Sequence, residues 1–256
     1  YISVWIALAG WLWRASVRQE TSAARGRRAD TPRRATVGVS AAGLVLLALS
    51  LTFASFDWLM SLAPSWSSRA FGAYWLTGGM VASLSALVLI TRGLRSANVL
   101  GGVIADAHDQ ALGVLLSVFV AFWGCVAYLQ VFAAWIGAVP SVPWLHTWGG
   151  AAMLLGIGAV HFVLPFLILL RHSAEHHPHR LHRVAVWLLV AHWVDTSWLV
   201  GPILGPLDLL PGFADVAALV AVVGLGVASG AWVLDGKAPI PLGDPRLEAS
   251  IRYEIG

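Results

Sequence analysis

The sequence predicts an all-α integral membrane protein built as a polytopic helical bundle. Hydrophobic residues make up 58% of the 256 residues and charged residues only 11%, whereas about a quarter of the residues in a soluble domain are charged. The mean hydropathy is +0.76. The apolar residues gather in runs of about the 20 residues that a span needs. Because lipid offers no partner to backbone N–H and C=O groups, each run is expected to be helical.

The apolar runs and the polar loops between them predict about seven transmembrane helices in a single domain, followed by a tail at 235–256. The first run begins at Tyr1 and is short, so we expect this chain to be part of a longer protein with its first span cut short. Each other run is bounded by polar or basic segments. In chain order the expected spans are 1–13, 37–60, 71–91, 110–137, 148–170, 184–204 and 213–234.

Basic residues alternate between consecutive loops. Fifteen of the 16 lysines and arginines fall in every second loop and in the tail, and one falls in the remaining loops. The positive-inside rule therefore predicts a cytoplasmic C-terminus. The basic segments are 14–36, 92–109, 171–183 and 235–256, and the others are 61–70, 138–147 and 205–212.

Two further patterns concern the edges of the bundle. Trp66, Trp144 and Trp148 fall near the expected outer interface, where amphipathic rings are favoured. The last span contains "GVASG", in which Gly226 and Gly230 permit close helix packing. We expect ordinary small-residue packing there rather than a dimer motif.

Three ionisable residues lie near the middle of predicted spans, where a charged side chain costs about 2.5–3.5 kcal/mol on insertion scales. His161 lies in the fifth span, and His192 and Asp195 lie in the sixth. The spacing of three residues puts His192 and Asp195 on one helix face. We expect His161 to be their neighbour across the helices.

Other polar residues extend this set toward both membrane surfaces. Asp57 lies near the outer end of the second span, and His108 and Asp109 lie at the inner mouth of the fourth. Tyr128 and Gln130 could fill gaps between them. Intramembrane Asp and His often mark proton routes, and histidine can relay a proton through its two nitrogens. We therefore predict a proton path along the whole set. The alternative is that each group is solvated or satisfied separately inside the bundle.

The sequence also excludes some functions. A retinal protein needs a lysine in mid-helix, and Lys237 lies beyond the last span. The single cysteine, Cys125, excludes an internal disulfide and leaves no cysteine motif for iron–sulfur or c-haem attachment. No nucleic-acid partner is expected, because the basic residues are confined to loops. Two alternatives stay open: a haem held by His161 with His192, and a metal held by the loop "RHSAEHHPHRLH".

Several long stretches together resemble a known family. They are "FASFDWLMSLAPSWSSRAFGAYWLTGGMVASLSAL", "HDQALGVLLSVFVAFWGCVAYLQVFAAWIGAVP", "GAVHFVLPFLILLRHS", "AVWLLVAHWVDTSWLVGP" and "PLGDPRLEASIRYE". This pattern is similar to the ActF-type membrane subunits of alternative complex III, the bacterial quinol:cytochrome c oxidoreductase, within the wider NrfD/polysulfide-reductase membrane-subunit family. The resemblance covers the chain from about residue 40 to its end.

The resemblance implies a fold of NrfD-like four-helix bundles with the N-terminal part missing, since the family subunit has about ten spans. It implies a chain that binds no cofactor and lies in the bacterial inner membrane beside lipid, with quinol as the substrate of the complex. It also implies partners: a multihaem c-type cytochrome, an iron–sulfur protein and a second NrfD-like subunit, which carry the haem c and iron–sulfur clusters. The six proton-path residues proposed for the family correspond to Asp57, His108, Asp109, His161, His192 and Asp195.

Two other functions remain open from the sequence. The chain could be a purely structural anchor for extrinsic iron–sulfur and c-haem subunits. It could also be a secondary transporter, although such proteins often show inverted repeats and broken helices in matching positions, and neither is visible here. Replacing His192 or Asp195 would separate the anchor from a subunit that moves protons.

Overall fold

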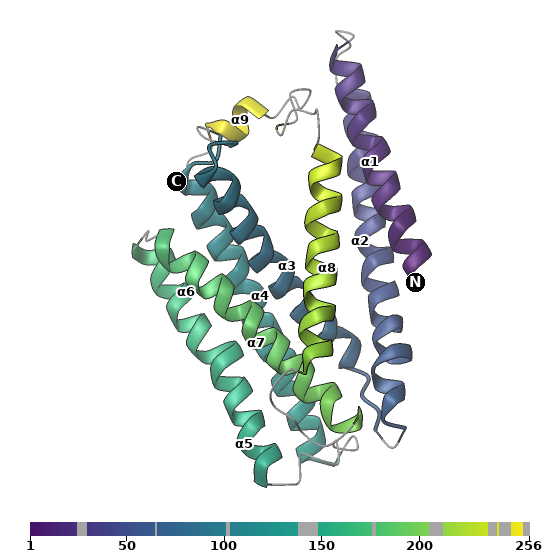
Figure 1. Cartoon of the computed structure of the whole chain (residues 1–256), viewed down its shortest axis with the longest axis vertical. Helices are drawn as coiled ribbons and strands as arrows, with labels where there is room; N and C mark the ends of the chain where they lie inside the picture. The colour runs from purple at the N-terminus through teal and green to yellow at the C-terminus, as the bar shows by residue number, and fades with distance from the viewer. Residues whose placement is uncertain are drawn as a thin grey trace.

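The computed structural model describes residues 1–24, 30–64, 66–100, 103–137, 148–175, 178–204, 212–234, 240 and 247–252. Within these residues the chain consists of helices joined by short turns and loops, and it contains no strand. Figure 1 shows long helices lying side by side in one elongated bundle. The protein is therefore an all-α polytopic membrane protein, as the composition and the apolar runs predict.

Most of the helices are longer than the apolar runs that predict them, because their ends continue into polar residues, whereas α8 matches the run 213–234. Two short segments interrupt or follow them: a 3-10 turn at Met60–Leu62 and a π-helical segment at Gly158–Val163. The α-helices are α1 (Ile2–Ala24), α2 (Asp30–Trp58), α3 (Phe71–Ser96), α4 (Asp106–Trp135), α5 (Trp148–Ile157), α6 (Leu164–Glu175), α7 (Pro178–Leu204), α8 (Phe213–Leu234) and α9 (Leu247–Ile251).

Six helical stretches in the described part of the chain are long and apolar enough to cross a membrane. They correspond to the second to seventh expected spans. The first expected span, 1–13, lies within α1, which continues past Arg14, Arg18 and Glu20 and is not among the six. The six stretches are Val37–Leu62, Phe71–Ser96, Asp106–Trp135, Gly149–Arg171, Arg180–Gly201 and Phe213–Val233.

Successive long helices alternate in direction, with α5, the π-helical segment and α6 acting as one interrupted helix (Figure 1). One end of the bundle therefore carries the ends of α3 and α6 and the starts of α4 and α7; we call it the basic end, because its loops are the basic ones. The opposite end carries the starts of α3 and α5 and the ends of α4 and α7. Helix α9 lies at the basic end, where His108 hydrogen-bonds to the Ser250 carbonyl at 3.0 Å.

The core lies among α3, α4, α6 and α7, whose buried hydrophobic side chains form one continuous cluster. Its centre consists of fully buried aliphatic side chains from all four helices. Glycines allow the closest approaches at its edges: a Cβ at Gly72 would lie 2.3 Å from Thr52 Cγ2, and one at Gly124 would lie 2.5 Å from Phe162 Cδ2. Small residues let helices in a membrane pack at such short range. The buried aliphatic residues include Val81, Leu116, Val120, Leu169 and Leu188.

Two expectations about the edges of the bundle have different outcomes. Helix α8 is exposed along its described length, and a Cβ at Gly226 or Gly230 would meet no atom within 4 Å. The expected packing at these glycines is therefore wrong for the described part of this chain, because no helix of that part approaches them. Trp66 lies at the opposite end of the bundle, packed edge-on against Phe71. Trp144 and the side chain of Trp148 lie outside the described residues.

The π-helical segment has a local cause in the sequence. Its wider turn lets the Leu164 N–H bond to the Ala159 carbonyl, five residues earlier. The next donor in that series would be residue 165, but Pro165 has no N–H. The Val160 carbonyl instead accepts a hydrogen bond from Trp187 Nε1 of α7, at 2.7 Å. This bond ties α7 to the segment that carries His161, and such segments often occur at functional sites.

Replacing Trp187 with phenylalanine should therefore destabilise the protein by about 0.6 kcal/mol and by at most about 1.7 kcal/mol, the mean and the maximum found for hydrogen bonds between transmembrane helices. The Val160 carbonyl would lose its partner within the bundle. Unfolding of the purified protein in detergent by increasing denaturant would measure the change. Trp232→Phe, on exposed α8, is the matched control and should leave stability unchanged; equal stability of both variants would contradict this role of Trp187.

Candidate functional site

The structure brings three of the predicted residues together with one that was not predicted. His161 comes from the π-helical segment, His192 and Asp195 from α7, and Tyr74 from α3. The Tyr74 hydroxyl donates a hydrogen bond to Asp195 Oδ1 at 2.5 Å, and His161 Nδ1 lies 3.7 Å from Asp195 Oδ2. Asp195 thus lies between the tyrosine and the histidine, and we call these four residues the acid cluster.

His161 and Asp195 of the acid cluster are buried, Tyr74 and His192 are half-buried, and nitrogen atoms of both imidazoles lack hydrogen-bond partners among the described residues. His161 is 1% exposed and Asp195 is 2% exposed. Within the part of the chain that the structure describes, neither nitrogen of His161 has a hydrogen-bond partner, and His192 Nδ1 also lacks one. Buried polar atoms in proteins are nearly always hydrogen-bonded. The unbonded imidazole nitrogens could therefore form hydrogen bonds to a ligand or take part in proton transfer.

Aromatic rings fix the positions of the two imidazoles. The Trp123 ring packs against His161, with 4.0 Å between centroids and 36° between planes. The centroid of His192 is 5.7 Å from that of His161 and 6.3 Å from that of Trp75. A Cβ at Gly78 would approach His192 Cε1 to 3.0 Å, so a larger residue there would press on this imidazole and shift it by a few tenths of an ångström.

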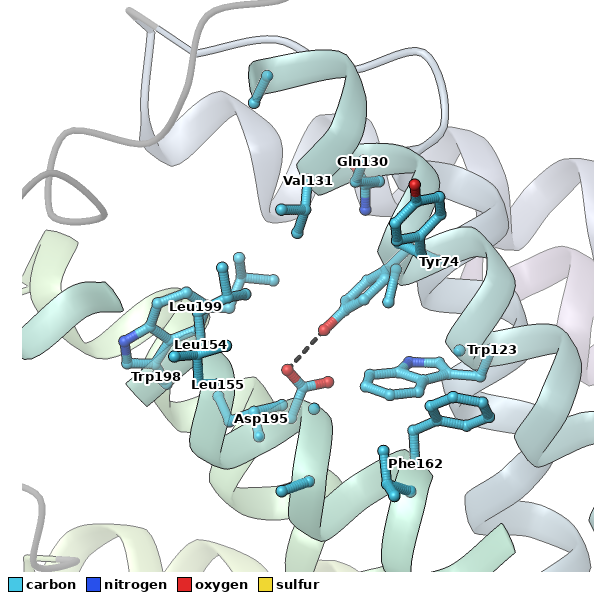
Figure 2. A pocket seen from close by; sticks show the side chains of 18 of the residues that line it. Tyr74, Trp123, Gln130, Val131, Leu154, Leu155, Phe162, Asp195, Trp198 and Leu199 are labelled. Carbon is cyan, nitrogen blue, oxygen red and sulfur yellow. Dashed lines mark hydrogen bonds between the residues drawn. The ribbon is translucent and has the colours of Figure 1, made fainter. Parts of the chain in front are cut away.

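A cavity of about 590 Å³ adjoins the acid cluster. Figure 2 shows the Tyr74 hydroxyl and the Asp195 carboxylate meeting at its edge, with Trp123 beside them. Its walls come from α3, α4, α5, the π-helical segment and α7, and most of the lining side chains are apolar. A cavity of this size with a few converging polar groups fits a small organic ligand. The lining also includes Phe71, Ala127, Val131, Leu154, Phe162, Trp198 and Leu199.

Asp57 is not part of this cluster. It lies at the end of α2, is exposed, and accepts a hydrogen bond from the Tyr1 hydroxyl. The rings of Tyr1 and Trp5 pack edge-on against Trp58 beside it. Asp57 therefore joins α1 to α2 at their contact and is bonded to Tyr1 rather than to a residue of the acid cluster.

His108 and Asp109 lie together at the basic end, at the start of α4. His108 Nδ1 accepts a hydrogen bond from the Ala105 N–H at 3.1 Å. Its Nε2 therefore carries the proton in the neutral ring and donates to the Ser250 carbonyl. Asp109 accepts from Arg95 at 3.2 Å, and Arg95 also binds Asp106 at 2.9 Å. These residues cap a helix and dock α9, and the structure does not bring them near His161.

The two residues expected to fill gaps both line the cavity. Gln130 Oε1 accepts a hydrogen bond from the Ser68 hydroxyl at 2.7 Å, which links α4 to the segment before α3. Tyr128 is 65% exposed and stacks on Phe132. Neither residue lies between the acid cluster and the basic end, so they extend the polar surface of the cavity toward the opposite end.

The donor atoms of His161, His192 and Asp195 all lie within 4.8 Å of one another, so these residues could approach a metal ion. Tetrahedral zinc, with bonds of about 2.0–2.1 Å, holds its ligand atoms about 3.3 Å apart. The 3.7 Å between His161 Nδ1 and Asp195 Oδ2 exceeds this separation, so one of the two side chains would have to shift before both could bind the same ion. The two imidazoles that a haem would need as ligands have centroids 5.7 Å apart, and the Trp123 ring packs against that of His161. The side chains of 172–179, most of the histidine-rich loop, lie outside the described residues.

Sequence reasoning did not single out Tyr74 or Trp123. Tyr74 lies one turn from the start of the predicted span 71–91. A tyrosine hydroxyl in such an apolar run usually has a hydrogen-bond partner, and this could have drawn attention to it. Trp123 is one of 14 tryptophans in the chain, and nothing in its local sequence distinguishes it from the others.

The fold and the site define a class: a polytopic α-helical membrane protein with a buried Tyr–Asp–His cluster at the edge of an apolar cavity. No family model matches the chain. No curated protein matches it either.

Proposed function

We propose that this chain is a membrane subunit of a bacterial respiratory quinol:cytochrome c oxidoreductase of the alternative complex III type. It would contribute to quinol oxidation and move the released protons through its intramembrane His and Asp residues. The single observation that carries the proposal is the acid cluster at the edge of the 590 Å³ cavity. The resemblance of the sequence to the NrfD-like membrane subunits supports the same function.

The chemistry needs a proton acceptor beside an apolar binding space. Oxidation of a quinol to a quinone releases two electrons and two protons. A carboxylate within hydrogen-bond reach of the quinol hydroxyl can accept one proton, as a general base does. Asp195 lies at the cavity edge for this step, and Tyr74 and His161 flank it to pass the proton on. The electrons would go to iron–sulfur and haem c groups in partner subunits.

The proposal includes the orientation of the chain in the membrane, which is inferred from the distribution of its basic residues. The basic loops and the C-terminus would face the cytoplasm of a bacterial cell, with the chain in the inner membrane. The opposite end of the bundle, where Gln130 and Ser68 line the cavity, would then face outward. Protons that leave the acid cluster through the cavity would be released on that outer side.

A paired substitution in the assembled complex tests the proposal. The complex containing this chain is purified from its native membranes, and its quinol:cytochrome c reductase turnover and proton release are measured with His192→Leu. We expect turnover to fall by about 10²-fold, the lower end of the contribution of a general acid–base group. His182→Leu, about 15 Å away on the same helix, is the control and should retain turnover.

The same experiment separates the other functions. A complex that carries His192→Leu with unchanged turnover and unchanged proton release would support a purely structural anchor and would overturn the proposal. Purification without any haem- or iron–sulfur-containing partner would contradict membership of such a complex and would favour a transporter.

A further inference from the structure

We infer that the acid cluster exchanges protons with only one side of the membrane, the side at the opposite end of the bundle, and is sealed from the basic end. The inference rests on the proposed function, because it concerns the direction in which the same groups lose their protons. It adds a restriction that the proposed function does not contain: this chain releases protons but does not conduct them across the membrane.

The open side of the acid cluster is the cavity. Tyr74 and Asp195 lie on its wall, and the lining continues along α4 through Ala127 and Gln130 to Ser68 and Trp66 at the opposite end of the bundle. The Ser68–Gln130 hydrogen bond places polar atoms on this stretch. The cavity therefore connects Asp195 with the opposite end of the bundle and provides a route for its proton.

The closed side is a layer of packed aliphatic side chains. From Trp123 to Asp109, α4 spans 14 residues, or about 21 Å at 1.5 Å per residue. Within that span Val120 is 1% exposed and Leu116 is 0% exposed. The facing helices contribute side chains that are equally buried, and all of them belong to one continuous core: Val81 and Val88 of α3, Leu169 of α6, and Leu181 and Leu188 of α7. Interiors packed in this way hold few voids as large as a water molecule.

The hydroxyl groups in this layer are already engaged within their own helices. Ser85 donates to the Val81 carbonyl at 2.7 Å, and Ser117 donates to the Val114 carbonyl at 2.7 Å. Thr77, beside the acid cluster, donates to the Ala73 carbonyl at 2.8 Å. Because each hydroxyl uses its proton on a backbone acceptor one turn away, these side chains do not form a chain from one helix to the next.

The titratable and charged groups that face the basic end lie beyond this layer. On α7 the nearest is His182, ten residues or about 15 Å from His192, with the fully buried Ala185 and Leu188 between them. On α4, His108 and Asp109 are held by Ser250 and Arg95. The remaining ones at described positions near this end include Arg92 and Arg95 of α3, Asp106 of α4, Arg171 of α6, Arg180 and Arg183 of α7, and Glu248 and Arg252 in and after α9.

Cysteine accessibility tests the inference without using turnover. In a Cys125→Ala background, single cysteines are placed at Ala127, which lines the cavity, at Ser117 in the sealed layer, and at Ser96, which is exposed at the basic end. The full chain is reconstituted in sealed vesicles, and a charged, membrane-impermeant methanethiosulfonate is added outside or inside. The cysteine at Ser96 defines which side is the basic end in each preparation.

We expect Ala127→Cys to be modified only from the side opposite to Ser96→Cys, and Ser117→Cys to be modified from neither side until the protein is denatured. Modification of Ser117→Cys from the basic end, or of Ala127→Cys from the basic end or from neither side, would overturn the inference. Proton permeability of the same vesicles under an imposed potential should equal that of protein-free vesicles. Loss of turnover in His192→Leu with labelling from both sides would leave the proposed function standing and remove only the one-sided access.

Discussion

With the proposed function, Asp195→Asn should lower the quinol:cytochrome c reductase turnover of the assembled complex by about 10²-fold or more, since positioned general bases contribute about 10²–10⁴-fold. The amide has nearly the shape of the carboxyl group, and its oxygen can still accept the hydrogen bond that Tyr74 donates to Oδ1. It cannot accept a proton near neutral pH. Steady-state turnover with a soluble quinol analogue, measured on the purified complex, gives the size of the loss.

A control variant and a stability measurement show whether this result is specific to the acid cluster. Asp215→Asn removes a carboxylate at the start of exposed α8, where it accepts only the local Gly212 N–H, and should leave turnover intact. The thermal midpoint of Asp195→Asn should stay within a few degrees of the parent protein, because the packing is kept. Full turnover in Asp195→Asn would show that this carboxyl group takes no part in proton transfer.

Gly124→Ala should destabilise the bundle by about 1–3 kcal/mol, the usual cost of overpacking a core. The added Cβ would lie 2.5–2.7 Å from three ring carbons of Phe162, so either the ring or the π-helical segment must move. His161 is the preceding residue in that segment. The variant should therefore also lower turnover, and denaturant unfolding beside steady-state kinetics would record both effects.

The cause of this loss can be checked by removing the ring. Phe162→Ala in the Gly124→Ala background should recover part of the lost stability, because the clash disappears although a cavity remains. Gly79→Ala, whose added Cβ meets no atom within 4 Å, should be neutral or slightly stabilising. If Gly79→Ala and Gly124→Ala lowered the stability equally, the contact with Phe162 would not be the cause. A general effect of alanine on helix propensity or on membrane insertion would then explain the loss.

The sequence predicted the membrane spans well because their signal is local. A run such as 71–91 or 213–234 must be helical in lipid whatever surrounds it, and the six spanning helices include these runs. Helix ends were less predictable. Helix α4 begins at Asp106 rather than near 110 because His108 reaches back to the Ala105 N–H and caps it. Such a cap depends on backbone geometry that hydropathy does not report.

The candidate site was predictable only in part. His161, His192 and Asp195 stand out because ionisable groups in mid-span are costly and therefore rare. Asp57, His108 and Asp109 carry the same kind of signal, yet they lie apart, with Tyr1 and Arg95 as partners. Depth along a helix can be read from the sequence, whereas rotation about its axis is set by contacts with neighbours such as the close approach at Gly124.

By itself, the sequence determined that the chain is a multi-pass helical membrane protein and which of its residues carry charge at membrane depth. Both properties follow from the free energy of placing each residue in lipid, one segment at a time. Only the tertiary structure decided that Tyr74 joins Asp195, that Val160 relies on Trp187, and that aliphatic packing lies on one side of the acid cluster and a cavity on the other. These features arise between helices far apart in the chain, where packing of surfaces rather than hydropathy selects the partner.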